Sequence, residues 1–381
     1  MIGNSGTSDR KERHLEVCVD PSRFRVETRP GGAGFDRLGF AHRALPELSL
    51  DEIDTGVEFL GQRLALPFLV SCMTGGSAGG GRVNRELARV ANSAKVAFGL
   101  GSFRVLLRDE TYLEDFRVKS LLPDVPLLAN IGAVVLREAG SAAVLGLAER
   151  IEADALVVHL NPGQELFQAD GDRDFRGLRA ALASLFERSK IPVIVKETGF
   201  GIGPAEVRSL LAAGAAWVDL AGAGGTNWIA VESYRLEEGP LHAAAADFDD
   251  WGYPTALLLA ALARAELPGR AAAVQPLAMG LPVIASGGLR NGVDVAKALA
   301  LGAGLTAMAL PLVRAVESGG PEAASAFIER VGAGLRSAML LTSSHNLSEL
   351  RRGILRFGPG FLEEARELAA ADGRAYSAER G

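Results

Sequence analysis

Short apolar runs alternate along the chain with longer stretches in which apolar residues recur at helical spacing. The clearest helical stretches are Val83–Ala94, Phe175–Arg188, Pro204–Ala213 and Val293–Leu301. Strands that alternate with helices pair in parallel, and nearly continuous apolar strands are buried on both faces, so the pattern predicts an α/β fold. The eight predicted strands are Leu66–Ser71, Val96–Gly99, Leu127–Ile131, Ala155–Leu160, Pro192–Lys196, Trp217–Leu220, Pro282–Ser286 and Leu305–Met308.

Eight such strands favour a closed (β/α)8 barrel, the TIM-barrel architecture, over an open sheet. Residues 1–60 form a predicted N-terminal extension with a flexible start, residues 61–355 the barrel, and residues 356–381 a charged, alanine-rich C-terminal tail. A polar, glycine-rich segment, residues 221–246, separates the sixth and seventh strands. We predict that this segment is a long irregular loop, because it interrupts the regular spacing of the other strands.

The composition is that of an ordinary globular protein, with 381 residues, 48% apolar residues and a formal net charge of −6. This charge argues against general binding to nucleic acids or membrane surfaces, so any basic site must be local. Cys18 and Cys72 form neither a CxxC pair nor a metal-binding spacing, which favours two reduced thiols. The polar N-terminus lacks the features of a signal peptide, and no apolar stretch is long enough to span a membrane. We therefore expect a cytoplasmic protein.

Glycine and polar clusters follow most of the predicted strands, at the carboxyl ends where barrels carry their active sites. The segment Ser286–Arg290 follows the seventh strand and contains Gly287 and Gly288, while Ala309 and Leu310 follow the eighth strand. Amides at such glycines and at a helix N-terminus can bind phosphate, so we predict a phosphate site between these two loops. Two ordinary tight turns are the alternative.

Lys196 ends the fifth predicted strand and is one of six lysines among 40 basic residues. A buried lysine needs an anionic partner or a lowered pKa, and reduced flavin carries negative charge that such a lysine would stabilise. A structural salt bridge and a Schiff-base lysine are the alternatives. Met73-Thr74-Gly75-Gly76, after the first strand, either lines a flat ring or forms a glycine hinge. Thr226, after the sixth strand, adds a hydroxyl donor for phosphate.

The segment His159–Glu165 places an imidazole, two carboxamides and a carboxylate directly after a buried strand. Glu165 is a hard oxygen ligand suited to Mg²⁺ shared with substrate phosphates. Gln164 cannot titrate, so it orients a substrate rather than transferring protons. His159 and Asn161 can donate hydrogen bonds to phosphate oxygens. A structural histidine with satisfied hydrogen bonds is the alternative for His159.

Three cations and a histidine lie close together in the N-terminal extension, within Arg10–His14. Arginine offers a bidentate fork and lysine a point charge, so Arg10, Lys11 and His14 could clamp a diphosphate. A solvated basic patch ahead of the fold is the alternative.

In this order, these motifs resemble those of the type 2 isopentenyl-diphosphate isomerase family over about residues 10 to 345. No single motif would be specific, but their ordered combination is. The resemblance rests on Arg10-Lys11-x-x-His14, Met73–Gly76, Ser102-x-Arg104, Asn130–Ala133, His159–Glu165, Gly171–Phe175, Val195–Glu197, Gly222–Thr226, Asp250–Ala256 and Ser286–Arg290.

The resemblance implies an isomerase that moves a double bond between isopentenyl and dimethylallyl diphosphate, with reduced FMN, Mg²⁺ and NADPH as reductant. It places Gln164 beside the reacting carbons as the catalytic residue and Glu165 on Mg²⁺, and it implies a homo-oligomer, a tetramer or an octamer. The implied substrate contacts are Arg10, Lys11, His14, Ser102, Arg104, His159, Asn161 and Gln164. The implied FMN contacts are Met73, Thr74, Ser102, Asn130, Lys196, Thr226, Gly287, Gly288, Arg290, Ala309 and Leu310.

The chain departs from the family pattern at three positions. Phe103 replaces a glutamine, which predicts the loss of a polar contact near the substrate phosphate. Gly163 replaces a larger apolar residue, which predicts an enlarged pocket, and Cys72 replaces alanine.

Three other functions remain open from the sequence. An FMN-dependent 2-hydroxy acid oxidase or dehydrogenase shares the barrel, but it needs a base histidine after the sixth strand. Here Ala221-Gly222-Ala223 follows that strand, and His242 is a poor substitute. The others are an isomerase for a modified allylic diphosphate and a non-catalytic binding protein.

Overall fold

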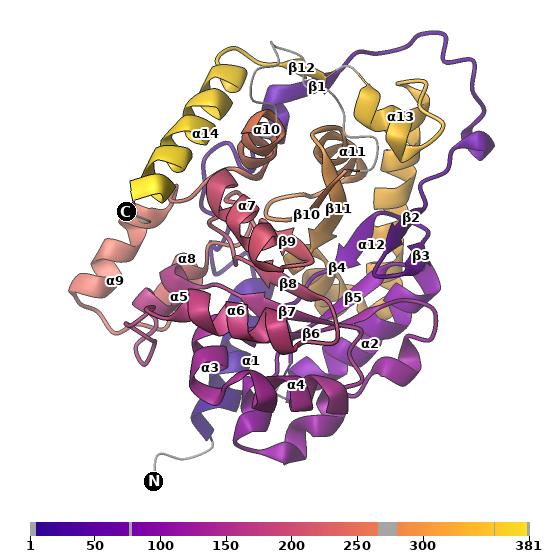
Figure 1. The fold of residues 1–381 in the computed structure, drawn as a ribbon. Coiled ribbons are helices and arrows are strands. Elements are labelled where there is room, and N and C mark those ends of the chain that lie inside the picture. The colour runs from indigo at the N-terminus through magenta and orange to yellow at the C-terminus, as the bar shows by residue number, and fades with distance from the viewer. Residues whose placement is uncertain (1–4, 76–77, 266–279, 354, 379–381) are drawn as a thin grey trace.

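The computed structural model describes residues 5–75, 78–265, 280–353 and 355–378. At its centre a closed barrel of eight parallel strands runs in the order β10-β11-β4-β5-β6-β7-β8-β9 (Figure 1). Each predicted strand corresponds to one barrel strand, so the predicted (β/α)8 barrel is confirmed. The barrel strands are β4 Phe68–Val70, β5 Ala97–Ser102, β6 Leu127–Gly132, β7 Ala155–His159, β8 Val193–Lys196, β9 Trp217–Asp219, β10 Leu281–Ala285 and β11 Ala303–Met308.

The carboxyl ends of adjacent barrel strands bring polar residues side by side. His159 on β7 pairs in register with Lys196 on β8, and Lys196 pairs with Asp219 on β9. The preceding parts of these strands are fully buried and apolar. Because parallel strands leave their polar ends at one rim, this register alone gathers the candidate residues.

Helices surround the barrel and close its outer face (Figure 1). Proline at the first turn of α5 and of α7, and the Asn227 side chain at the start of α8, favour these helix starts. The α-helices are α1 Ser5–Val19, α2 Ala78–Ala94, α3 Ala133–Ala139, α4 Ser141–Arg150, α5 Pro162–Phe167, α6 Leu178–Arg188, α7 Pro204–Ala213, α8 Trp228–Ser233, α9 Pro240–Ala244, α10 Thr255–Ala265, α11 Gly292–Ala300, α12 Leu310–Leu340, α13 Leu347–Arg352 and α14 Phe361–Ala378. The 3-10 helices are η1 Phe35–Arg37, η2 Leu50–Glu52, η3 Arg104–Leu107, η4 Glu110–Asp115, η5 Lys119–Leu121 and η6 Ala245–Phe248.

The described parts of the N-terminal extension and of the C-terminal segment contact each other and the helices around the barrel. Two short strands of the extension, β2 Val57–Phe59 and β3 Gln62–Leu64, form a hairpin, while β1 Leu38–Phe40 pairs antiparallel with β12 Leu355–Phe357 near the C-terminus. The helix α14 packs on α7 and α10, and the Asp372 carboxylate accepts the Ala205 N–H at the start of α7.

Two sequence expectations about irregular segments are wrong. The start of the extension is the helix α1, which packs on α2, α8 and α12. About half of the segment 221–246 is helical, in α8, α9 and the start of η6. Both segments bury side chains against residues that are distant in the sequence. The hydrophobic pattern of such short helices does not reveal these contacts. None of the described helices is long and apolar enough to cross a membrane.

Candidate active site

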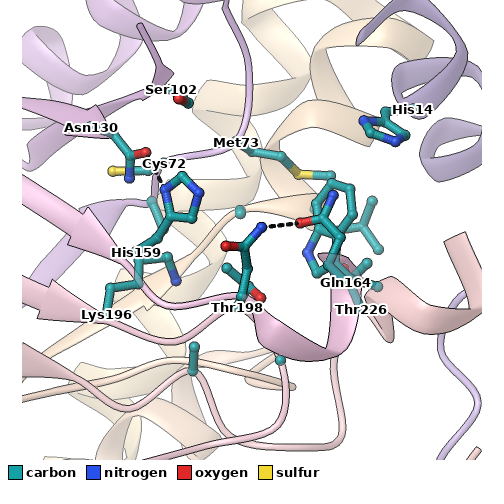
Figure 2. A pocket seen from close by; sticks show the side chains of 18 of the residues that line it. His14, Cys72, Met73, Ser102, Asn130, His159, Gln164, Lys196, Thr198 and Thr226 are labelled. Atoms are coloured by element: carbon teal, nitrogen blue, oxygen red, sulfur yellow. Dashed lines mark hydrogen bonds between the residues drawn. The ribbon is translucent and has the colours of Figure 1, made fainter. Parts of the chain in front are cut away.

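A pocket opens at the carboxyl ends of the barrel strands, under α1 and beside α5 and α8 (Figure 2). It brings together residues that lie far apart in the sequence. The predicted site residues that line it are Lys11, His14, Met73, Thr74, Ser102, Arg104, Asn130, His159, Asn161, Gln164, Glu165, Lys196, Thr226, Gly287, Gly288, Arg290, Ala309 and Leu310. The Arg10 side chain lies outside the described part of the chain.

The amide of Gln164 is held at both ends in the first turn of α5. Its Oε1 accepts a hydrogen bond from Asn161 Nδ2 at 3.2 Å, and its Nε2 donates to Glu232 Oε1 at 2.8 Å. Figure 2 shows Gln164 among the side chains that line the pocket. Because one end accepts and the other donates, these two partners fix which way the amide faces.

Glu232, on α8, is a site residue that sequence reasoning missed. It is 1% exposed and also lies 2.8 Å from His14 Nε2, while Arg235 Nη1 donates to its other oxygen at 2.6 Å. Burial by itself would raise the pKa of Glu232, but the hydrogen bonds from His14 and Gln164 and the charge of Arg235 outweigh it and lower this pKa. The available signal was a single carboxylate after the apolar run Trp228–Val231.

Glu165 presents a buried carboxylate to the pocket. Asn161 Nδ2 donates to Oε1 and the Asp172 N–H donates to Oε2, each at 3.0 Å. These donors hold the carboxylate in place, and its oxygens keep further lone pairs for a cation. Among the described residues, no group of three or more His, Cys, Asp or Glu side chains is arranged to hold a metal ion by itself. One carboxylate completed by phosphate oxygens and water is the ligand set that Mg²⁺ commonly accepts, so the site fits that ion.

His159 is neutral in the free protein. Its Nδ1 lies 2.8 Å from Asn130 Oδ1, so Nδ1 carries the proton and Nε2 presents a lone pair. Burial, with the charges of Lys196, Lys11 and Arg104, lowers the pKa of His159 to about 3. In this state Nε2 can accept but not donate a hydrogen bond, so the predicted donation to a phosphate oxygen requires a protonated ring and stays a prediction. The same three cations form a positive field suited to a diphosphate.

The predicted phosphate site is a cradle of glycines between two loops. Gly287 has φ 92° and Gly288 φ 83°, and a side chain at Gly225 would meet the Gly288 nitrogen at 2.7 Å. In the described part of the chain, the Gly287 and Gly288 amides donate to no other residue. The start of α12, at Leu310, also has no side-chain cap. These features fit the phosphate of FMN.

The helix α11 contributes less to this cradle than the sequence predicts. Its first two free amides, of Val293 and Asp294, both donate to the Asn291 side chain at 2.9 Å. The Arg290 guanidinium is also engaged, because it donates to Glu27 and to the Leu289 carbonyl. Among the described residues, the amides that could donate to a phosphate here are therefore those of Gly287, Gly288 and Leu310.

Lys196 forms a buried ion pair and also faces the pocket. Its Nζ lies 3.4 Å from Asp219 Oδ2, a second residue that the sequence did not single out. Nearby, the Ser71 and Thr198 hydroxyls line the pocket and have no hydrogen-bond partner among the described residues. A buried polar atom without a partner costs about 1–3 kcal/mol, so these hydroxyls favour a polar ligand such as a flavin ring here.

The helix α1 covers the pocket with its basic residues. Lys11 Nζ donates to the Ser102 carbonyl at 2.8 Å, while His14 contacts Glu232. Ser102 Oγ accepts the Arg104 N–H at 3.3 Å, which links the two substrate-side candidates on β5 and η3.

Comparison with known proteins shows the family. The chain matches the FMN-dependent dehydrogenase family over residues 26–110 and 157–357. It is 42% identical over 358 residues to the isopentenyl-diphosphate delta-isomerase of Synechococcus sp., covering 93% of this chain and 98% of that protein. A protein of the same name from Xanthobacter autotrophicus is 43% identical over 355 residues, covering 92% and 98%. The chain belongs to the isopentenyl-diphosphate delta-isomerase family, on an FMN-dependent framework.

Solved structures of other flavoenzymes share the fold of this isomerase family member. A flavocytochrome b2 variant aligns with TM-score 0.63 at 17% identity, covering 94% of this chain and 84% of that one. A lactate oxidase of Pediococcus acidilactici gives TM-score 0.62 at 17% identity, covering 93% and 94%. His242, the residue considered for an oxidase base, is exposed on α9 and does not line the pocket.

Two departures from the isomerase family pattern lie outside the pocket. Phe103 is fully buried in the hydrophobic core and does not line the pocket, so the loss of a polar contact with the substrate phosphate stays a prediction. Gly163 lines a neighbouring cavity, and a Cβ there would lie 2.7 Å from the Phe200 ring. It therefore makes room for Phe200 instead of enlarging the site.

The third departure, Cys72, lines the pocket beside Asn130 and His159 (Figure 2), and burial raises the pKa of its thiol to about 11.

The neutral His159 makes the fold sensitive to acid. Its pKa lies below the value of about 6.5 expected in the unfolded chain, so the unfolded state binds one more proton between those values. We therefore expect the free energy of unfolding to decrease as the pH is lowered through this window. Relative to neutral pH, His159 should account for a decrease of at most about 2 kcal/mol at pH 5. Urea unfolding of the wild type and of His159→Asn should show a shallower pH dependence in the variant. Parallel curves would contradict the assignment.

Proposed function

We propose that the chain interconverts isopentenyl diphosphate and dimethylallyl diphosphate by adding and removing protons, with reduced FMN, Mg²⁺ and NADPH as reductant. The observation that carries the proposal is one pocket that combines a flavin-type glycine cradle, Lys196, the carboxylate Glu165 and the oriented amide of Gln164. The family membership supports the same reaction.

The basic side of the pocket binds the diphosphate. Lys11 and Arg104 supply positive charge from α1 and η3. Glu165 would hold Mg²⁺ together with phosphate oxygens, and Asn161 keeps the Glu165 carboxylate in place. These positive groups also hold the diphosphate in one position, which limits its loss as a leaving group during the reaction.

Gln164 orients the hydrocarbon part of the substrate. The Glu232 carboxylate and Asn161 hold its amide, so the side chain presents one fixed polar edge to the reacting carbons. Bound reduced FMN supplies the acid–base group and the electron-rich face that an unactivated alkene requires. Lys196 would balance negative charge on that ring. Met73, Trp228 and Leu310 add apolar lining, which limits the access of water.

The decisive assay is anaerobic turnover of isopentenyl diphosphate with FMN, NADPH and Mg²⁺. We expect dimethylallyl diphosphate to form, and we expect no product when FMN, the reductant or Mg²⁺ is left out. Dithionite in place of NADPH should restore turnover, which separates a failure of reduction from a failure of isomerisation. Absence of product with dithionite-reduced FMN and Mg²⁺ would overturn the proposal.

The same assay distinguishes the alternative functions. Reduction of bound FMN by lactate or glycolate would favour a 2-hydroxy acid dehydrogenase. Turnover confined to a modified allylic diphosphate would retain the chemistry and change the substrate. Binding of FMN without any turnover would indicate a binding protein.

Glu165→Gln should raise the Mg²⁺ concentration that gives half-maximal activity at least tenfold. Both Glu165 oxygens accept hydrogen bonds from N–H groups, and an amide can accept at only one position. The substitution also removes the charge that attracts the cation. Magnesium titrations should include Glu149→Gln, an exposed position on α4, as the matched control. An unchanged magnesium requirement would remove the metal assignment.

We further infer a homo-oligomer, a tetramer or an octamer, from the family resemblance, and a cytoplasmic location. The location is supported by the two cysteines, which are free in the fold. Light scattering of the FMN-loaded protein would measure the oligomeric state.

A further inference from the structure

Asp219 lies at the point where the predicted flavin lysine meets the predicted phosphate loop. It ends β9, is 2% exposed, and faces Lys196 in register on β8. Its Oδ1 accepts hydrogen bonds from the Ser286 hydroxyl and from the Ala221 N–H at 3.3 Å. Its Oδ2 is thereby directed to Lys196 Nζ, at 3.4 Å.

Two titratable neighbours of Lys196 are neutral. His159, its register partner on β7, is neutral near pH 7, since its pKa is lowered to about 3. The Cys72 thiol is protonated, since burial raises its pKa to about 11. Within the described part of the chain, Asp219 is the carboxylate that forms an ion pair with Lys196.

We propose that Asp219 is a positioning residue that fixes Lys196 at the rim of the barrel and offsets its charge, and so lowers the reduction potential of bound FMN below the value that Lys196 alone would set. This inference rests on the proposed FMN-dependent function and deepens it.

The charge balance follows from Coulomb interactions in a dry pocket. A lone ammonium group beside the flavin would stabilise the negatively charged reduced ring and favour reduction. A carboxylate that forms an ion pair with this ammonium group cancels much of its electric field at the flavin. Excess positive charge would favour the deprotonated form of the reduced ring, and the proton that the reaction needs would then be missing. The balance between Lys196 and Asp219 therefore suits an isomerase, which returns its cofactor unchanged.

Ser286 joins this ion pair to the phosphate loop. Its hydroxyl donates to Asp219, and its carbonyl accepts from the Gly222 N–H and from the Thr255 hydroxyl, both at 3.0 Å. The residue that sets the charge near the ring is therefore held by the loop that holds the phosphate.

The test is the midpoint potential of bound FMN in four forms of the holoenzyme, measured by anaerobic dye equilibration. Asp219→Asn should raise the ratio of reduced to oxidised FMN at fixed potential at least tenfold, about 30 mV for a two-electron couple. Lys196→Met should lower the ratio by a similar factor. The double variant, from which both charges are absent, should lie near the wild type.

Asp51→Asn is the matched control, because it makes the same chemical change at an exposed position on η2, outside the residues that line the pocket. In this variant the ratio of reduced to oxidised FMN at fixed potential should stay within threefold of the wild-type ratio. An unchanged or lowered potential in Asp219→Asn would overturn the proposal. If Asp219→Asn does not fold, the double variant must still exceed Lys196→Met, and equality of those two would also overturn it. Failure of the wild type to bind FMN would instead overturn the proposed function.

Discussion

Gln164→Asn should lower kcat at least 100-fold and leave the FMN dissociation constant within twofold of the wild type. Asparagine is one methylene shorter, so its amide cannot contact both Asn161 and Glu232 as the Gln164 amide does. Misplacement of an orienting group by about 1 Å can cost about 100-fold in rate. The measurement is anaerobic turnover of isopentenyl diphosphate, together with flavin fluorescence titration.

Gln62→Asn is the matched control for this substitution. It makes the same chemical change on β3, outside the residues that line the pocket, and should leave kcat unchanged. Glu232→Gln should resemble Gln164→Asn in part, because the neutral amide weakens the hold on Gln164 and leaves His14 without its anionic partner. Loss of FMN from Gln164→Asn would contradict its role at the substrate.

Gly287→Ala should weaken FMN binding at least 100-fold and lower the free energy of unfolding by about 2–4 kcal/mol. A Cβ at this position would lie 2.0 Å from the Gly222 carbonyl oxygen, and the backbone has φ 92°. The loop must therefore shift, which also displaces the Gly287 carbonyl from the Thr255 hydroxyl, now 2.6 Å away. Fluorescence titration with FMN and urea unfolding measure the two effects.

Gly140→Ala separates backbone strain from close approach. Gly140 has a similar φ of 80°, but a Cβ there would meet nothing within 4 Å. Its ψ of 155° lies in a region that is essentially restricted to glycine, so we expect the substitution to cost about 1–3 kcal/mol of stability and to leave FMN binding unchanged. If Gly287→Ala binds FMN like the wild type, the cradle does not hold the cofactor phosphate.

The barrel could be predicted because each strand carries its own signal. Nearly continuous apolar runs such as Ala155–Leu160 are specific enough to locate a buried strand, and β7 covers five of those six residues. Their carboxyl ends then had to share one rim, which placed Lys196 beside His159 without any tertiary information. The helix α1 and the helical part of residues 221–246 were missed, because their faces are buried against other segments rather than by local periodicity.

The chemistry of single residues depended more on contacts than on motifs. Glu232 and Asp219 carry no motif of their own, and they matter because α8 and β9 bring them to Gln164 and Lys196. Phe103 sits between two pocket residues in the sequence but points into the core. The sequence near Gly163 suggested extra space, whereas Phe200 occupies it.

The sequence by itself determined the architecture, the rim on which the site lies and most of the residues that line the pocket. Those properties follow from hydrophobic periodicity and strand ends, which are local. Only the tertiary structure decided which groups are charged, paired or oriented. The neutral His159, the Lys196–Asp219 pair and the fixed amide of Gln164 arise from distances between segments that the sequence separates widely. Protonation and hydrogen bonding depend on burial and on atoms within a few ångströms, which a linear pattern does not contain.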